Sequence, residues 1–451
     1  MASSPTMAVP LTADASDDSI LDDPRIELRL RPLLEDCRAR RIPELGFLSL
    51  FSGTLDASPP EGAKEWRCGT LIPYCFALAE CSDRILGLVD AIRRKGRFQV
   101  LQVDDTLGAA LIDSRESIRA TPPANIMMPS GTAAAPLIAV FDTGVDDRSR
   151  KPFHPFLPSA TFSIDKVSTD KFPADLNGHG TAVAVAALGR DNDKPIGVCP
   201  TCGLVDVRVL RRYGVGKESE VVWALEDVIH RNLTNAQPQV RVALMAFAAD
   251  TDSRGDDVLS CAINCAFENG ILVVSAIGNR PTKLVPTPAA ASCGLAVGGV
   301  DTRETGTGRA LASGGRIVEV PGGRDDDKWW RFSSEGPRLS PFIPDPDACP
   351  NGHLKPDVVA PAVNVCVPLA EDPKYCQPRD GTSMAAALVA GAAGLLFATY
   401  PKASAADVAN ALRNTACFGG IQGTDCVAPA WDEKTGWGMI DVHRALQELK
   451  P

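Results

Sequence analysis

The sequence predicts an α/β fold, namely a mainly parallel, doubly wound sheet covered by helices on both faces and preceded by a small α+β domain. Two observations predict it. Beyond residue 136, short apolar runs alternate with helical patterns, as in right-handed βαβ units. The chain has 451 residues, which is more than one ordinary compact domain needs.

The alternating segments of the larger domain are short enough to be buried strands. The apolar runs occupy residues 137–141, 204–210, 240–247, 271–276 and 295–300, and the helical patterns occupy 179–188, 219–231, 256–269 and 383–400. Parallel strands that are buried on both faces are apolar throughout, so we expect one parallel sheet. In such sheets the functional residues gather at the carboxyl ends of the strands.

Shifts in composition divide the chain into four expected parts. These are an N-terminal extension that is partly disordered (1–44), a small α+β domain (45–120), a linker rich in Pro, Ala and Gly (121–135) and the larger α/β domain (136–451).

The small domain has its own pattern of elements. A strand-like run (47–51) is followed by an amphipathic helix that starts at Ser82 and ends at Gly96. Two alternating runs, 98–103 and 109–112, then predict two more strands. A strand, a helix and two strands make a small α+β unit.

The composition excludes several classes of protein. Apolar residues make up 45% of the chain, which is enough for a large core and argues against a disordered protein. The net charge is −10 without a long run of Lys and Arg, so we expect no nucleic-acid partner. No apolar run looks long enough to span a bilayer, so we expect no membrane partner.

The localisation stays uncertain at this stage. Residues 1–23 lack a basic start and an apolar core, so no secretory signal is evident and the cytoplasm is favoured. The 14 cysteines favour a secreted protein as the alternative. Buried thiols, disulfides, or a metal or redox site would each account for the close pairs, which are Cys199 with Cys202, Cys261 with Cys265, Cys366 with Cys376 and Cys417 with Cys426.

Four polar residues stand at strand ends or helix starts. Asp142 and Asn279 each follow an apolar run, whereas Ser383 and His179, which has glycine on both sides, open helical patterns. Each residue alone has a structural explanation, because Asp and Asn form turns and Ser caps helices. Their shared position at one edge of a parallel sheet predicts a common site.

The four residue types match the needs of nucleophilic catalysis. A serine hydroxyl becomes a good nucleophile when a neutral imidazole removes its proton, and a carboxylate orients that imidazole. A fixed amide donor stabilises the oxyanion that forms on the attacked carbonyl. Asp142, His179, Ser383 and Asn279 are therefore the candidates for carboxylate, base, nucleophile and oxyanion donor.

The motifs around these residues resemble those of the subtilisin-like serine peptidases, the subtilases. They read Asp142-Thr143-Gly144, His179-Gly180-Thr181, Ala276-Ile277-Gly278-Asn279 and Gly381-Thr382-Ser383-Met384-Ala385, with further matches at 332–337, 355–361 and 436–438. The order Asp, His, Ser is that of subtilisin. The resemblance covers residues 136–446 and implies a serine endopeptidase that hydrolyses peptide bonds through an acyl-enzyme on Ser383.

The resemblance also implies a groove in which the substrate pairs as an extra strand between two protein strands. One wall would be Gly214-Val215-Gly216 and the other Ala246-Phe247-Ala248, where the family usually has Ser, an apolar residue and Gly. Ala276, Ile277, Gly278 and Thr382 would lie beside the groove.

Arg280 would lie at the rim of the pocket for the substrate residue that precedes the cut. We hypothesise that small or acidic residues are tolerated there and that large basic ones are disfavoured. The alternative for Arg280 is a solvated surface side chain.

The resemblance makes proteins or peptides the expected substrates and requires no cofactor. Asp191-Asn192-Asp193 offers oxygen ligands, but Phe156 replaces the aspartate that the family has after the equivalent of His154-Pro155. Calcium binding is therefore possible but not predicted, and no metal ligands are assigned.

Subtilases often carry an α+β prodomain that assists folding and occupies the groove until it is cleaved. Residues 45–120 are thus expected to be an intramolecular inhibitor, with a permanent partner-recognition domain as the alternative. For the whole chain, a catalytically inactive peptide-binding scaffold and a peptide ligase or macrocyclase that uses the same acyl-enzyme are the alternative functions.

Overall fold

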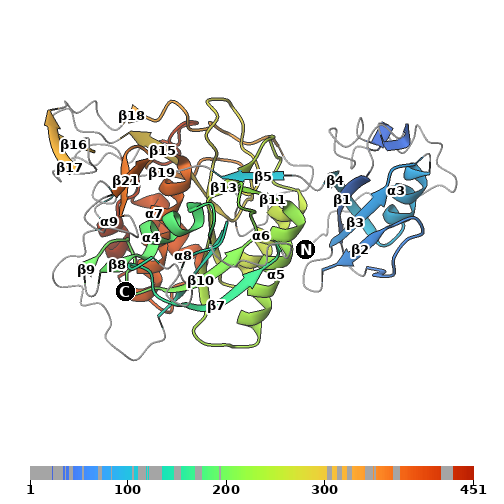
Figure 1. Cartoon of the computed structure of the whole chain (residues 1–451), viewed down its shortest axis with the longest axis horizontal. Helices are drawn as coiled ribbons and strands as arrows, with labels where there is room; N and C mark the ends of the chain where they lie inside the picture. The colour runs from blue at the N-terminus through green and yellow to red at the C-terminus, as the bar shows by residue number, and fades with distance from the viewer. Residues whose placement is uncertain are drawn as a thin grey trace, which may run out of the picture. The chain divides into compact units, whose positions relative to one another are not determined.

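The computed structural model of the chain (Figure 1) describes most of the larger domain and much of the smaller one. The described residues are 23, 34–35, 37–39, 44–52, 55–69, 74–82, 84–103, 106–109, 118, 120, 135–146, 154–167, 175–191, 194–301, 307–311, 317–321, 328–340, 349, 352–368, 376–417 and 430–450. The backbone packs into two units, Met1–Asp104 and Asp105–Pro451.

Within its described residues, the first unit contains a four-stranded antiparallel sheet and a helix that packs against it. The strand order is β2 (Glu65–Cys68), β3 (Tyr74–Glu80), β1 (Glu44–Ser52) and β4 (Arg97–Val103), and helix α3 is Ile85–Arg93. Apolar residues of α3 share one core with Phe47, Phe51 and Phe98 of the sheet. The expected helix begins at Ile85, later than Ser82, whose hydroxyl accepts from the Arg84 amide, and β2 and β3 were not foreseen.

Two disulfides join parts of this unit. Cys37 is bonded to Cys81, and Cys68 on β2 is bonded to Cys75 on the neighbouring strand β3. The bond from Cys37 ties the short helical segment before β1 to the end of β3. These bonds supplement the modest core that a unit of this size can bury.

The second unit is built on an eight-stranded sheet. Its strands run in the order β18 (Lys328–Trp329), β15 (Leu295–Asp301), β14 (Leu272–Ala276), β12 (Val240–Met245), β6 (Leu137–Asp142), β10 (Gly203–Arg208) and β7 (Ala160–Asp165), and β19 (Val358–Pro361) also pairs with β15. Every pairing is parallel except that of β15 with β18. The expected mainly parallel sheet is confirmed.

Helices cover both faces of this sheet, as expected. They are α4 (His179–Leu188), α5 (Glu218–Leu233), α6 (Val258–Glu268), α7 (Thr382–Thr399), α8 (Ala405–Asn414) and α9 (Val442–Glu448). Ile138 and Val140 of β6 share one core with α4 and α7. Ala139 and Phe141, which point to the opposite face, are also fully buried.

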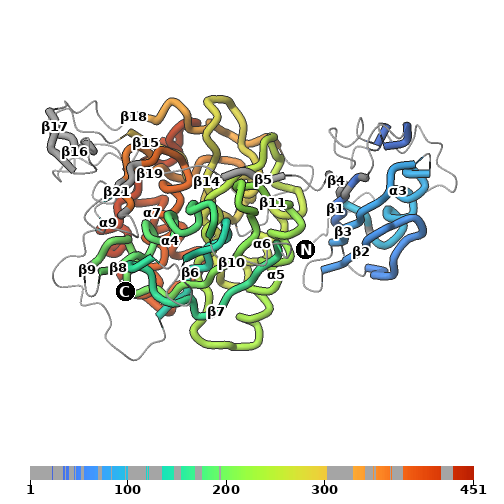
Figure 2. Tube along the Cα trace, in the orientation of Figure 1, coloured from blue at the N-terminus to red at the C-terminus, as the bar shows by residue number. Residues whose placement is uncertain are grey.

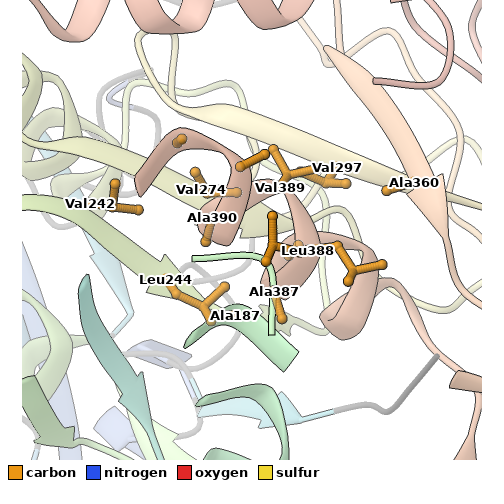
Figure 3. Close-up of a cluster of buried hydrophobic side chains, with 14 of the residues drawn as sticks. Ala187, Val242, Leu244, Val274, Val297, Ala360, Ala387, Leu388, Val389 and Ala390 are labelled. Atoms are coloured by element: carbon orange, nitrogen blue, oxygen red, sulfur yellow. The ribbon is translucent and has the colours of Figure 1, made fainter. Parts of the chain in front are cut away.

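Helix α7 is buried on all sides. It packs against α4 and against strands β12, β14 and β15, and Figure 3 shows its Ala387, Leu388, Val389 and Ala390 among side chains of these elements. By length and composition α7 could cross a membrane, which we did not foresee, but 94% of it is buried inside the fold. An all-round apolar helix of this kind belongs to the core of a large domain.

Small residues allow α4 and α7 to lie side by side although they are far apart in the chain (Figure 2). A Cβ atom on Gly391 of α7 would stand 2.5 Å from the carbonyl oxygen of Ala187 in α4 and 2.7 Å from Val198 Cβ. Any side chain at position 391 would therefore push the two helices apart. His179 and Ser383 lie in the first turns of these two helices.

A buried group of charges secures the segment before β19. Lys355 Nζ donates to the Gly294 carbonyl and to Asp357 Oδ2, both at 2.8 Å, and Arg413 binds the other carboxylate oxygen of Asp357 at 2.8 Å. Burial lowers the pKa of Lys355 to about 8, which shows the cost of removing its ammonium from water. Asp357 also accepts from the Ala296 amide at 2.7 Å and so joins β19 to β15.

Gly391→Ala should lower the free energy of unfolding by about 1–3 kcal/mol, because the added methyl group overpacks the contact with Ala187. Urea denaturation measures the change. The matched control is Gly87→Ala in α3, where an added Cβ meets nothing within 4 Å, so its unfolding midpoint should stay the same or rise. Equal effects of the two substitutions would contradict the close packing.

Candidate active site

A buried carboxylate holds the ring of His179. Asp142 ends β6, His179 opens α4, and the two side chains are 0% and 1% exposed. His179 Nδ1 lies 2.7 Å and 2.8 Å from the two carboxylate oxygens of Asp142. The Thr143 amide donates to Asp142 Oδ1 at 2.8 Å, which fixes the carboxylate in turn. Nδ1 therefore carries a proton that the carboxylate accepts.

The glycine after His179 permits this contact. A Cβ on Gly180 would stand 2.1 Å from the Gly144 carbonyl oxygen and 3.0 Å from Asp142 Cβ. The Gly180 amide donates to Thr143 Oγ1 at 3.1 Å. The first turn of α4 can therefore lie directly on the end of β6.

Ser383 is the second residue of α7 and is fully buried. Its hydroxyl donates to the Ala246 carbonyl at 2.7 Å. A hydroxyl has a single proton, so this bond must break before the group can donate to an imidazole. The position near the helix N-terminus places Ser383 among backbone amides without intrahelical acceptors.

Asn279 is joined to the same helix end by its amide oxygen. Asn279 Oδ1 accepts from the Thr382 amide at 2.8 Å and from Thr382 Oγ1 at 2.9 Å. Thr382 Oγ1 accepts from the Gly278 amide at 3.2 Å. With Oδ1 held by these donors, the two N–H groups of Asn279 remain for the cavity that this residue lines.

A cavity of about 210 Å³ lies beside Ser383 and Asn279. Six other predicted site residues line it with them, namely Phe247, Ala248, Ala276, Gly278, Arg280 and Thr382, and the remaining described lining residues are Ala249, Asp250, Thr251, Leu284, Pro286 and Ser334. Ile277 instead packs into a small apolar cluster, and Gly214 precedes strand β11 (Val215–Lys217). Eight of the 14 described lining residues are thus among those that the sequence singles out.

A strand of the chain itself lies between the two predicted groove walls. Strand β5 (Thr106–Ala109) pairs antiparallel with β11 on one side and with β13 (Phe247–Ala249) on the other. Gly108 is opposite both Val215 and Ala248, and Ala109 is opposite Phe247.

The partner of this strand differs from our expectation. The alternating run 109–112 was expected to complete the small domain, but β5 belongs to the second unit, and residues 110–112 lie outside the described residues. The edges of β11 and β13 that face β5 provide amide and carbonyl groups on both of its sides. A short strand that is paired along both edges is held better than one that is paired along a single edge.

Asp175 is a residue of this site that we did not foresee. Its Oδ1 accepts from Thr143 Oγ1 at 2.8 Å and from the Gly178 amide at 2.9 Å. Its Oδ2 accepts from the Thr181 amide at 2.9 Å and from Thr181 Oγ1 at 2.7 Å. One buried carboxylate thus joins the end of β6 to the residues on both sides of His179. An Asp shortly before a helix start is a capping signal, which could have identified it.

The described cysteines settle part of the question left open by the sequence. Cys199 and Cys202 form a disulfide, as do Cys293 and Cys349. Cys261 and Cys265 are free thiols, and burial raises the pKa of both. Cys417 is disulfide-bonded, whereas Cys426 and the side chains of Cys366 and Cys376 lie outside the described residues.

Among the residues that the structure describes, no group of three or more His, Cys, Asp or Glu side chains could hold a metal ion. Asn192 and Asp193 of the loop considered for calcium lie outside these residues.

Asp175→Ala should destabilise the fold by at least about 2 kcal/mol, because it leaves several buried donors without an acceptor. It should also weaken the bond between His179 and Asp142. Thermal unfolding measures the first effect, and the proton NMR signal of the His179 Nδ1–H measures the second. Asp441→Ala, which removes the N-cap of α9, is the control, and that NMR signal should not change in it.

Comparisons with known proteins agree with this geometry. A sequence model of the subtilase family matches residues 133–438. The chain is 27% identical to "Serine protease AprX" of Bacillus subtilis (strain 168) over 61% of its own length and 60% of AprX. It is 30% identical to "Subtilisin DY" of Bacillus licheniformis over 55% of this chain and 74% of that protein. It is also 30% identical to "Subtilisin Savinase" of Lederbergia lenta, over 63% and 84%. The chain belongs to the subtilase family.

Proposed function

We propose that this subtilase is a serine endopeptidase that hydrolyses peptide bonds through an acyl-enzyme on Ser383. The observation that carries the proposal is the buried contact of 2.7 Å between His179 Nδ1 and Asp142. Ser383 and Asn279 line a cavity that a substrate could enter. An imidazole held by a carboxylate, a hydroxyl and an amide donor are the catalytic groups of a serine peptidase. The subtilase family and the relatives that are named as proteases support it.

In the first half of the reaction, the Ser383 hydroxyl turns from the Ala246 carbonyl and gives its proton to His179. Its oxygen adds to the substrate carbonyl, and the negative charge goes to the carbonyl oxygen. The N–H groups of Asn279 and the Ser383 amide stabilise this oxyanion. Asp142 stabilises the imidazolium.

In the second half, the imidazolium protonates the leaving amine as the carbon–nitrogen bond breaks, which leaves an ester on Ser383. Water then gives a proton to His179 and adds to the ester carbonyl. Collapse of this second tetrahedral species releases the new carboxyl group and returns the proton to Ser383. No cofactor is needed in either half.

The substrate would bind as a strand between β11 and β13, as the pairing of β5 suggests. In that register, the substrate residue opposite Phe247 precedes the one opposite Ala246. The Ala246 carbonyl accepts from Ser383, so the residue opposite Ala246 would carry the bond that is cut.

Asn279→Ala should lower kcat by a factor of about 10²–10³, which is the loss that removal of such a donor causes in subtilisin itself. Ser383→Ala should abolish turnover and also labelling by a serine-directed fluorophosphonate. Rates on a peptide substrate and mass mapping of the labelled residue measure these effects. Full activity in Ser383→Ala, or a label on another residue, would reject the assignment.

We also propose that the N-terminal part of the chain is an inhibitory prodomain. Strand β5 follows directly on the first unit and pairs on both sides with the strands that would bind substrate. A substrate strand has no edge to pair with while β5 is in place. A permanent partner-recognition domain would not need such a strand.

Removal of this block should occur by cleavage between Ala110 and Leu111. Gly108 is opposite Ala248, and the same register, continued by two positions, would bring residue 110 opposite Ala246. Residues 110 and 111 lie outside the described residues. N-terminal sequencing of the incubated protein should give a chain that starts at Leu111, together with a rise in peptidase activity. Ser383→Ala is the control and should stay uncut. An active enzyme that keeps its full N-terminus would exclude the prodomain.

A further inference from the structure

Strand β11, which pairs with one side of β5, is described in full and places no side chain of its own in the core. Val215 and Lys217 are exposed, and the residue between them is Gly216. A Cβ on Gly216 would stand 2.2 Å from the Val209 carbonyl oxygen, so the strand lies directly on the backbone beneath it. The position of β11 therefore depends on the residues that bind its two ends.

Arg211 and Glu220 bind these two ends and also bind each other. Before the strand, the Arg211 amide donates to the Val215 carbonyl at 2.8 Å. After the strand, the Lys217 amide donates to Glu220 Oε2 at 2.9 Å. The Arg211 guanidinium then donates to both carboxylate oxygens of Glu220, from Nη1 at 2.8 Å and from Nη2 at 2.6 Å. We call this pair of residues, which encloses the strand, the clasp.

The geometry of the clasp is that of a strong ion pair. Two parallel bonds between a guanidinium and a carboxylate are charge-assisted and fix the orientation of both groups. The Arg211 and Glu220 side chains are 34% and 9% exposed, so water screens the pair only in part. Glu220 lies in the first turn of α5, where the helix dipole also stabilises a carboxylate. The clasp thus attaches β11 to the start of a long helix.

The turn that leads into β11 is joined to the segment before His179. The Gly214 amide donates to the Arg211 carbonyl at 2.8 Å and closes this turn. Asn177 Nδ2 donates to the Arg212 carbonyl, which belongs to the same turn, at 2.9 Å. The clasp and this bond together hold β11 at a fixed place relative to His179.

The register of β5 shows which substrate residues β11 would bind. Residues 106–108 pair with β11, and Gly108 is opposite Val215. With the proposed cut after residue 110, these are the fifth, fourth and third positions before the cut. Strand β13 instead pairs with residues 107–109. A peptide with two residues before the cut would therefore reach β13 but not the paired positions of β11.

We infer that Arg211 and Glu220 are positioning residues of the site, which hold β11 where it can pair with the third to fifth substrate residues before the scissile bond. The inference rests on the proposed peptidase function and on the proposed register of cleavage. Both residues act through the backbone of β11. Loss of the clasp should therefore weaken the binding of long peptides and spare the chemical step.

The test measures kcat and KM on two peptides that have the same residues around the scissile bond. The long peptide has five residues before this bond, and the short one has two. The full-length protein is incubated beforehand until its activity is constant. Arg211→Gln should lower the long-to-short ratio of kcat/KM about three- to tenfold, mainly through a higher KM for the long peptide, because binding common to ground and transition state is lost.

Further variants separate the clasp from a general loss of stability. Arg211→Lys keeps the charge but not the paired bonds, so its ratio should lie between those of the original protein and Arg211→Gln. Adding Glu220→Gln to Arg211→Gln should lower the ratio little further, because the two residues act as a unit. The matched control is Asp227→Asn, which removes another carboxylate of α5, one that binds Lys166 at 2.5 Å, and it should leave the ratio unchanged.

Two results would overturn the inference while leaving the peptidase function intact. One is an unchanged ratio in Arg211→Gln, or in Arg211→Lys if the first variant does not fold. The other is an equal fall of the ratio in Asp227→Asn. If neither peptide is cut and a fluorophosphonate does not label Ser383, the peptidase function itself fails.

Discussion

The contact between α4 and α7 is the constraint on which the site depends. Gly391 lets α7 approach the Ala187 carbonyl, and Gly180 lets α4 approach the end of β6. These two contacts are matters of van der Waals distance, not of chemistry. Together they decide whether the imidazole at the start of α4 and the hydroxyl at the start of α7 can reach the same substrate carbonyl group.

The parallel sheet provides the other half of this arrangement. Asp142 ends β6, Asn279 lies shortly after β14, and β12 lies between these strands. The carboxyl ends of parallel strands meet at one edge, so residues from distant parts of the chain arrive together. Asp175 and Thr382 then fix the angles of the polar groups by hydrogen bonds of 2.7–2.9 Å. Thus burial sets the distances and hydrogen bonds set the orientations.

Much of this could be predicted from the sequence, and the reasons are local. Helix α4 has the predicted bounds because glycine flanks its first residue and Gly189 follows its last. The apolar run 240–247 was harder, because it contains the end of β12 and the start of β13 without a polar residue at the bend. Alternation in residues 98–112 indicates strands but carries no information about their partners, so β5 was placed in the wrong unit. The disulfide of Cys37 with Cys81 was beyond sequence reasoning, because connectivity depends on the fold.

The all-round burial of α7 has a consequence for the synthesis of the protein. The helix begins at Thr382, whereas the first strand that it covers, β6, begins at Leu137. Contacts so distant along the chain form slowly, and a ribosome exposes the sheet long before it releases the helix. A nascent chain would therefore show a bare apolar face that favours chaperone binding. Ser383 emerges on the same segment that closes the core, so the candidate site is completed only when the core is.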